Sequence, residues 1–288
     1  MLQNTFCHLP GVGFAREQEL WASGVTSWES FLEDTHLPFF RTKRPCIEDE
    51  LRRSRQQLDS RQVGYFAERL PSREQWRMFR EFRDTAAYLD IETTGLNGDT
   101  DHITTISMYD GATVFYYIYG QNLADFPRDI QRYHLLITYN GKGFDVPFLE
   151  QTFHIEMPQA HIDLRYVLRS LGYSGGLKSC EKQVGIHREG LEDVDGFMAT
   201  ILWDEFIRHG NARALETLLA YNIEDAVNLE CLMIHGYNRK IRETPFSESH
   251  ALPWPNKPKN PCAVDAATLM HLRKRLYGGR FFASNAAQ

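Results

Sequence analysis

The chain has 288 residues, of which 42% are hydrophobic and 24% are charged, and its formal net charge is -6. This length can bury a substantial core and suits one large domain, or one medium domain with an appendage, in a soluble globular protein. No apolar run approaches the roughly 18 residues that cross a bilayer, and the N-terminal MLQNTFCHLP lacks the pattern of a secretory signal. We therefore expect a cytoplasmic protein with no membrane partner.

The positions of the cysteines and the local charge bear on whether the protein is stabilised by disulfides, binds zinc or binds nucleic acid. The five cysteines lie far apart without a CxxC pair, which excludes a disulfide framework and a cysteine zinc site. The net charge gives no general attraction to nucleic acid, but residues 41–84 hold twelve Lys/Arg against eight Asp/Glu. This basic segment either lies along a phosphate backbone or forms an ion-paired, solvated helix face.

Residues 1–84 predict a helical N-terminal segment. The stretch LPGVG at 9–13 resembles the hairpin of helix-hairpin-helix modules, whose exposed amides grip phosphate. The helix expected after it, FAREQELWASG, is hardly basic, which favours packing against the rest of the chain or a partner. Thr26 or Ser27 is expected to cap the next helix, and helical character over 47–84 is broken near Pro71.

From residue 86 the pattern changes to strands. AAYLDIE, ITTISMYD, ATVFYYIY and HLLITY are rich in β-branched and aromatic residues, and a tight turn is predicted at Asp110 and Gly111. Helices are expected at 145–154, 161–171, 177–184, 196–208 and 213–236, with one more edge strand at either 153–157 or 161–163. The order predicts an α/β fold over 85–242 in which three antiparallel strands are followed by alternating helices and parallel strands.

The C-terminal part, residues 243–288, is predicted to be a Pro-rich extended tail with a short helix at 269–279.

The stretch AYLDIETTGLNGD, residues 87–99, contains two acids at the end of an apolar strand. Since side chains alternate along a strand, Asp90 and Glu92 share one face while Leu89 and Ile91 point to the other. Two adjacent carboxylates repel each other, and a divalent cation is the usual remedy.

Two later stretches add acids. ITYNGKGFDVPFL at 137–149 leaves a strand, turns and begins a helix near Asp145, and in AYNIEDAVNL at 220–229 Tyr221 and Asp225 share one helix face. Each feature alone has an ordinary explanation: a strand-end acid pair, a helix start, a core tyrosine near a surface acid. Together and in this order they predict a site for a hard, oxygen-preferring ion such as Mg²⁺ or Mn²⁺.

DIETTGL, YNGKGFDVPFL and YNIED resemble the three sequence blocks of the DEDD exonucleases in their Tyr-containing form, within the RNase H-like superfamily. GGLKSCEKQVGI and HIDLRYVLR are similar to the bacterial YprB-type branch. The resemblance implies an RNase H-like fold, a mixed five-stranded sheet flanked by helices. It also implies two Mg²⁺ or Mn²⁺ ions held by Asp90, Glu92, Asp145 and Asp225, with Asp90 bridging them, and a Tyr221 hydroxyl that orients or deprotonates the attacking water.

Substrate contacts are expected at five further residues, each with a simpler alternative. In the family the leucine at Leu96 wedges against the terminal base, although a core leucine is the alternative. Thr93 and Asn140 either contact the substrate or form turns. Phe144 either stacks a base or packs in the core before a helix. Lys178, after Gly175 and Gly176, is either a counter-charge for phosphate or part of a flexible loop. His161 and Asp163 begin a helix-like run, and Asp163 either caps this helix or supports the metal ligands. His187 and Arg188 are weaker candidates for reaching nucleic acid.

We therefore expect a divalent-metal-dependent 3′–5′ exonuclease that hydrolyses phosphodiester bonds of single-stranded DNA or RNA and whose partner is nucleic acid with a free 3′ end. The 3′ polarity comes from the resemblance. Two alternatives stay open: a catalytically silent nucleic-acid-binding or scaffold protein, and a structure-selective endonuclease of the same fold. No feature reports on a 2′-hydroxyl contact, so the sequence does not choose between DNA and RNA.

Overall fold

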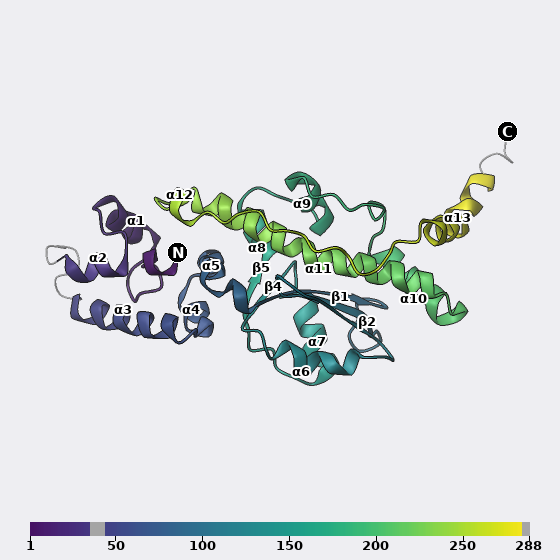
Figure 1. Cartoon of the computed structure of the whole chain (residues 1–288), viewed down its shortest axis with the longest axis horizontal. Coiled ribbons are helices and arrows are strands. Elements are labelled where there is room, and N and C mark those ends of the chain that lie inside the picture. The colour runs from purple at the N-terminus through teal and green to yellow at the C-terminus, as the bar shows by residue number, and fades with distance from the viewer. Residues whose placement is uncertain (35–43, 284–288) are drawn as a thin grey trace.

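The structure is a computed structural model that describes residues 1–34 and 44–283. Its centre is one five-stranded sheet in the order β3-β2-β1-β4-β5 (Figure 1). The strands are β1 (Ala86–Thr93), β2 (Ile103–Tyr109), β3 (Val114–Ile118), β4 (Leu135–Thr138) and β5 (Ala160–Asp163). β2 is antiparallel to β1 and β3, whereas β4 is parallel to β1 and β5. The predicted mixed five-stranded sheet is confirmed.

The fifth strand settles an alternative left open by the sequence. The edge strand is at 160–163, so the other predicted position, 153–157, is wrong: α7 ends there and a loop follows. The helix expected from residue 161 begins only at Leu164, because His161 and its neighbours pair with β4 and Asp163 caps the helix that follows.

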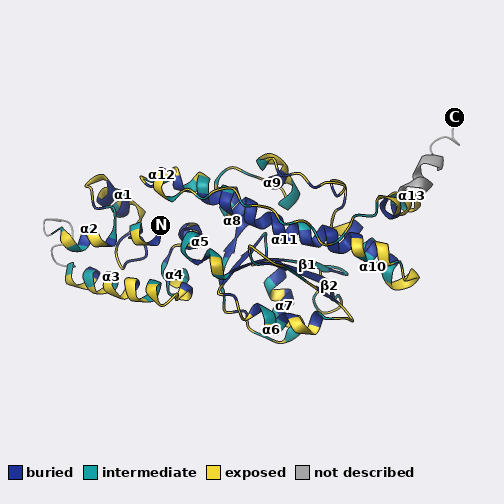
Figure 2. Ribbon diagram, in the orientation of Figure 1, coloured by how far each residue is buried: buried dark blue, intermediate teal, exposed yellow. Residues whose placement is uncertain are grey.

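Helices cover both faces of the sheet (Figure 1). The long α11 (Ala212–Ile241) lies across one face, and α6 (Phe126–Ile130) and α7 (Asp145–Phe153) lie on the other. The remaining helices of this part are α8 (Leu164–Ser170), α9 (Leu177–Val184) and α10 (Gly196–His209), with a single 3-10 turn, η5, at Leu123–Asp125. α11 runs five residues beyond its predicted end, and Tyr237 and Ile241 in its last turns are buried (Figure 2).

Alternation along β1 separates the two layers. Leu89 and Ile91 pack with Phe148 and Leu149 of α7 in one buried cluster, on the opposite face from α11. Asp90 therefore points toward α11, where its carboxylate meets a side chain of that helix. The predicted division of this strand into an apolar and an acidic face is confirmed.

The N-terminal segment is helical, as expected. Its elements are η1 (Leu2–Asn4), α1 (Phe14–Ala22), α2 (Trp28–Glu33), α3 (Arg44–Asp59), α4 (Val63–Arg69), η3 (Ser72–Met78), α5 (Phe79–Phe82) and η4 (Arg83–Thr85). Ser27 is the cap of α2, and the helical run breaks at Pro71 between α4 and η3. Before LPGVG the chain forms only the three-residue η1, and Leu9 and Val12 are buried, so this stretch packs inward and turns into α1.

The charges of the basic segment are mostly paired along α3. Arg44 pairs with Glu48 and Arg53 with Glu50, three or four residues apart on the helix surface. This arrangement favours the ion-paired helix face over a phosphate-binding strip for α3. Residues 41–43 of the segment lie outside the described residues.

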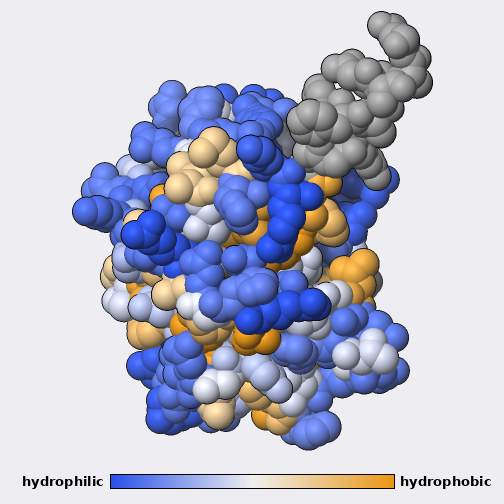
Figure 3. Space-filling model, turned by 90° about the vertical axis from the view of Figure 1, so that its right-hand side faces the viewer, coloured by the Kyte–Doolittle hydropathy of each residue, from blue (hydrophilic) through white to orange (hydrophobic). Residues whose placement is uncertain are grey.

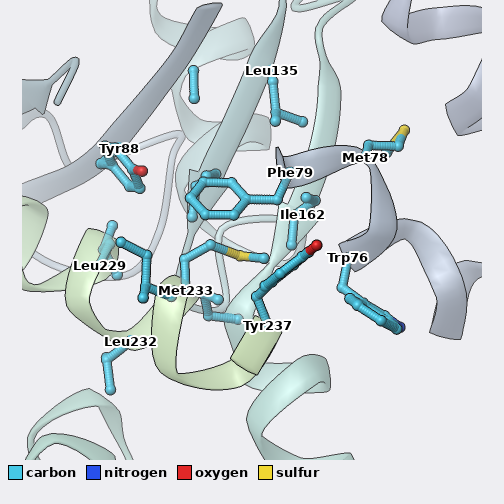
Figure 4. Close-up of a cluster of buried hydrophobic side chains, with 14 of the residues drawn as sticks. Trp76, Met78, Phe79, Tyr88, Leu135, Ile162, Leu229, Leu232, Met233 and Tyr237 are labelled. Carbon is cyan, nitrogen blue, oxygen red and sulfur yellow. The ribbon is translucent and has the colours of Figure 1, made fainter. Parts of the chain in front are cut away.

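The N-terminal segment and the sheet share one hydrophobic core (Figure 4). Trp76 and Phe79 pack against Tyr237 of α11, with ring centroids 5.4 and 6.2 Å apart. Beside this contact, buried Arg77 donates to both Glu17 oxygens at 2.9 and 2.8 Å, so that both charges are compensated. The segment is thus built onto the sheet domain through apolar and ionic contacts.

The C-terminal part returns along α11 (Figure 1). It contains α12 (Ser247–His250), an extended Pro-rich stretch, and α13 (Ala266–Ala283), which is longer than the predicted helix. The Asn260 side chain donates to the Ala220 carbonyl at 2.9 Å, which ties the extended stretch to α11. Residues 284–288 lie outside the described part.

The end of the molecule with α10 and α13 is largely hydrophilic, with scattered apolar patches (Figure 3). Phe197 and Ile207 of α10 and Met270 of α13 are exposed. Within the described residues, none of the helices combines the length and apolar character needed to cross a membrane.

Phe79→Ala tests the shared core. Because Phe79 is fully buried against Tyr237, we expect the free energy of unfolding to fall by about 3–5 kcal/mol, within a single cooperative transition. Urea unfolding followed by circular dichroism and by tryptophan fluorescence measures the free energy of unfolding and shows whether there is one transition. The control, Phe197→Ala at an exposed position, should change stability by less than about 0.5 kcal/mol. Two separate transitions would show that the segment and the sheet unfold independently.

Candidate metal centre

Three carboxylates from two elements converge beside the sheet. β1 carries Asp90 and Glu92, and α11 carries Asp225 across the face above them. One oxygen from each lies within 4.8 Å of the others. Asp225 is buried, whereas Asp90 and Glu92 are partly exposed, so an ion from solvent can reach them.

Asp145 approaches the same group from the opposite layer. It is the first residue of α7, is buried, and lies outside the 4.8 Å group formed by the other three acids. Burial raises its pKa to about 7, although hydrogen bonds from its own amide and that of Ile91 act in the opposite direction. Its charge in turn raises the pKa of Asp90 and Glu92, so all four predicted acids interact electrostatically.

The acids are held in an environment that disfavours their charged forms. Removal from water, followed by repulsion from Asp225 and Asp145, raises the pKa of both Asp90 and Glu92 well above the ordinary range. Such a group of hard oxygen donors is stabilised either by protons or by cations. Its donor set and negative charge fit Mg²⁺ or Mn²⁺.

Asn222 is a site residue that the sequence analysis missed. Its amide nitrogen donates to Asp90 Oδ2 at 2.7 Å, and its oxygen accepts from Thr105 at 3.0 Å and Ser107 at 2.8 Å. Thr105 and Ser107 are the β2 partners of Glu92 and Asp90, so Asn222 links the two strands to α11. A polar residue in an apolar helix, three residues before Asp225, was the available signal.

Arg188 and Glu181 form a second support that was missed. Arg188 forms an ion pair with Asp225 and donates two hydrogen bonds to Glu181, both at 2.6 Å. Asn228 of α11 donates to the same glutamate at 3.0 Å, and these side chains are buried. The arrangement fixes Asp225 from the side of α9, whereas the sequence analysis considered Arg188 only as a weak candidate for contacting nucleic acid.

Tyr221 lies one helical turn before Asp225, as predicted. The Lys178 ammonium is 4.6 Å and the Arg188 guanidinium carbon 5.7 Å from its ring centroid, so two cations flank the ring. Burial and then the charges of Asp225 and Glu92 raise its pKa far above the ordinary value. The hydroxyl therefore keeps its proton at neutral pH in the metal-free protein, and no described residue hydrogen-bonds to it.

The loop after β1 carries two of the predicted substrate contacts. Leu96 is 85% exposed, so the alternative of a core leucine is wrong. Thr93 donates to the Gly95 carbonyl at 2.6 Å, which favours the turn explanation for its hydroxyl.

The loop between β4 and α7 holds Asn140 and Phe144. Asn140 has a positive φ of 67°, and its backbone amide donates to the Asp163 carboxylate at 2.8 Å. Its side-chain oxygen accepts a hydrogen bond from Arg165. Phe144 is half-buried and packs against Phe148, with ring centroids 5.7 Å apart, which is the packing alternative. Lys178 Nζ has no hydrogen-bond partner among the described residues.

Comparison with known proteins places this site in a family. A family model described as RNase_H_2 of the RNase_H superfamily matches residues 87–237, which is 151 of the 288 residues. The protein YprB of Bacillus subtilis (strain 168), itself described as uncharacterized, is 30% identical over 186 residues. That match covers 57% of this chain and 43% of YprB, so the chain spans less than half of that relative.

Two solved structures are loosely similar. NrnC of Brucella melitensis with bound Mg²⁺ is 20% identical with a TM-score of 0.40, covering 68% of this chain and 86% of NrnC. The family B DNA polymerase of Pyrobaculum calidifontis is 12% identical with a TM-score of 0.40, covering 58% of this chain and 27% of the polymerase. From the family match over more than half of its length, the chain belongs to the RNase H superfamily.

Proposed function

We propose that this protein is a divalent-metal-dependent exonuclease that removes nucleotides from the 3′ end of single-stranded DNA or RNA. The observation that carries the proposal is the convergence of Asp90, Glu92 and Asp225 to within 4.8 Å, with Asp145 in electrostatic contact. Membership of the RNase H superfamily supports nuclease chemistry. The 3′ polarity and the Tyr-containing subtype rest on the resemblance of the three sequence blocks.

The four acids are proposed to hold a pair of Mg²⁺ or Mn²⁺ ions. Such a pair supplies charge stabilisation for the entering and leaving oxygens of a phosphodiester. Asp90, held by the hydrogen bond from Asn222, would contact both ions. Glu92 and Asp225 would help to hold one of them, and Asp145, which lies outside the group formed by the other three acids, would help to hold the second largely through water.

Tyr221 is proposed to orient the attacking water. Because its raised pKa keeps the phenol protonated, the hydroxyl serves as a hydrogen-bonding group and not as a strong base. Cation contacts of Lys178 and Arg188 with the ring help to hold its position. The Lys178 ammonium is buried without a hydrogen-bond partner among the described residues, and we propose that it acts as a counter-charge for a phosphate of the substrate.

Leu96 is proposed to contact the terminal base. A leucine that is 85% exposed, three residues beyond the end of β1, is free to pack against a base that enters the site.

Asp90→Asn tests the activity directly. With Mn²⁺, the unaltered protein should shorten a 5′-labelled single strand from its 3′ end, and EDTA should abolish this. Asp90→Asn should lower the rate by more than the roughly 10–100-fold that is typical when a residue that only supports a metal ligand is lost. Asp193→Asn is the matched control, because that side chain is 81% exposed and outside the cluster.

A panel of DNA and RNA, single- and double-stranded, assigns the substrate. Binding without any product would favour the silent nucleic-acid-binding alternative. Cleavage of circular single strands, which offer no end, would contradict an exonuclease.

Tyr221→Phe separates water orientation from metal binding. The ring and its cation contacts remain, so the affinity for Mn²⁺ measured by calorimetry should not change. Turnover should fall by about tenfold or more, since assistance to the attacking water typically contributes 10²–10⁴-fold. Tyr133→Phe, whose hydroxyl donates to Asp110 on another part of the sheet, is the control. Unchanged turnover would remove Tyr221 from the mechanism.

The raised carboxyl pKa values predict a pH dependence in EDTA. Asp145 shifts from 3.8 to about 7, so between these values the folded protein retains a proton that the unfolded chain has lost. Stability should therefore fall as pH rises through this window, and Asp145→Asn should flatten the decline. Urea titrations at several pH values measure it. Mn²⁺ uptake should release protons, seen by calorimetry in buffers of different ionisation enthalpy; uptake without release would contradict the assignment.

A further inference from the structure

A cavity of about 470 Å³ lies between the N-terminal segment and the edge strand β5. Its walls come from η3, the loop between β4 and α7, the end of β5, and α8. The volume is within the range of small-ligand pockets. None of the four acids lines it, so it is separate from the candidate metal centre.

The cavity opens at the same edge of the sheet as the acids. β1, β4 and β5 are parallel, and Thr138 at the end of β4 pairs with Asp163 at the end of β5. Neighbouring strands are about 4.8 Å apart, so β5 lies roughly 10 Å from β1 along this edge. The loop that supplies Lys142 to the cavity leads directly to Asp145. A nucleic-acid strand that leaves the acids and crosses β4 therefore reaches the cavity.

The charged groups at the cavity favour an anion. Lys142 has no ion pair within the described residues, and its ammonium donates only to Gln75, at 3.4 Å. Arg73 is 68% exposed and lies 3.6 Å from Glu74, a carboxylate already paired with buried Arg77. Lys142 thus lacks an ion-pair partner among the described residues, and Arg73 shares its nearest carboxylate with Arg77.

The acid at the cavity, Asp163, offsets the charge of Lys142 only in part, because burial outweighs its effect on the pKa of that lysine. Asp163 is buried, and its carboxylate accepts amide hydrogens from Asn140, Lys142 and Arg165 at 2.8, 3.2 and 3.0 Å. These hydrogen bonds come from the loop between β4 and α7 and from the first turn of α8, and they stabilise the charge of the carboxylate.

The remaining wall suits a planar, apolar group. Tyr166 is 59% exposed on α8, and the buried Trp76 and Ile162 provide apolar surface below it. An exposed aromatic ring beside cations whose charge is only partly neutralised is the combination that holds a nucleotide of a single strand, through base stacking and phosphate contact.

We infer that this cavity is a binding subsite for a nucleotide upstream of the one being removed, with Tyr166 stacking the base and Arg73 and Lys142 contacting phosphate. The inference rests on the proposed exonuclease function for the direction of the strand. It also gives the N-terminal segment a part in substrate binding, because η3 supplies one wall.

Substrate length tests the subsite. Tyr166→Ala and Arg73→Ala should each raise KM for an octanucleotide by about tenfold, the order expected for one stacked base or its phosphate contact. KM and kcat for a dinucleotide should change less than about twofold, because its one upstream nucleotide lies next to the acids, whereas the cavity, roughly 10 Å from β1, takes a nucleotide further upstream. The matched controls are Tyr116→Ala, exposed on β3, and Arg128→Ala, exposed on α6; both should leave the two substrates unaffected. Thermal melting verifies folding of each variant.

Fluorescence anisotropy with labelled octamers of DNA and RNA in EDTA keeps this test independent of turnover. Weaker octamer binding in Tyr166→Ala supports the subsite even if no hydrolysis is ever seen, so failure of the exonuclease proposal is distinguishable. Equal losses for dinucleotide and octamer, or none for either, would overturn the inference. So would tight binding of a free mononucleotide that Tyr166→Ala removes without affecting the octamer, since the cavity would then serve a soluble ligand.

Discussion

Repulsion among the carboxylates is the constraint on which the candidate site depends. Asp90 and Glu92 are forced onto one face by the geometry of β1, and α11 brings Asp225 against them. Left alone, such a cluster would favour separation of strand and helix. The structure opposes this with the Asn222 bridge between β2, β1 and α11, and with Arg188, which binds Asp225 from the loop after α9. Rigid supports keep the acids close enough to share cations, at a cost in stability that cations or protons can relieve.

The elements packed around the sheet also hold α11, and with it Asp225, in place. α11 is buried along most of its length, between the sheet on one side and the returning C-terminal stretch on another. At its far end Tyr237 packs against Trp76 and Phe79, so the helix that carries Asp225 is also anchored in the N-terminal segment. We propose that residues 1–84 form no independent module: they brace α11 and provide a wall of the cavity beside β5. The division of the chain at 84/85 and 242/243 then describes sequence character more than separate folding units.

The sequence predicted what depends on short-range periodicity. Alternation along 86–93 placed Asp90 and Glu92 on one face, and the helical spacing of Tyr221 and Asp225 placed them together, because both rules follow from backbone geometry. It failed where partners are remote or where local signals conflict. For residues 161–163 the sequence left a strand and the start of a helix open, and pairing with β4 decided for the strand. Arg188 reaches Asp225 only because α9 packs on α11, a contact that no local pattern encodes. Leu96 is exposed since the loop after β1 is closed by its own hydrogen bonds, such as that from Asn97 to Asp101, and not by burial.

Formal charge offers an independent reason for expecting a pair of ions with a phosphodiester. The four acids carry four negative charges when ionised, and Arg188 is balanced by Glu181, with which it shares two hydrogen bonds. Lys178 offsets one charge, which leaves three. One divalent ion would leave the site negative and repel a phosphodiester, whereas two ions make it positive by one, which the single charge of a phosphodiester neutralises. The side chains around Tyr221 thus set a charge that is balanced only when metal and substrate are present together, so each should strengthen the binding of the other.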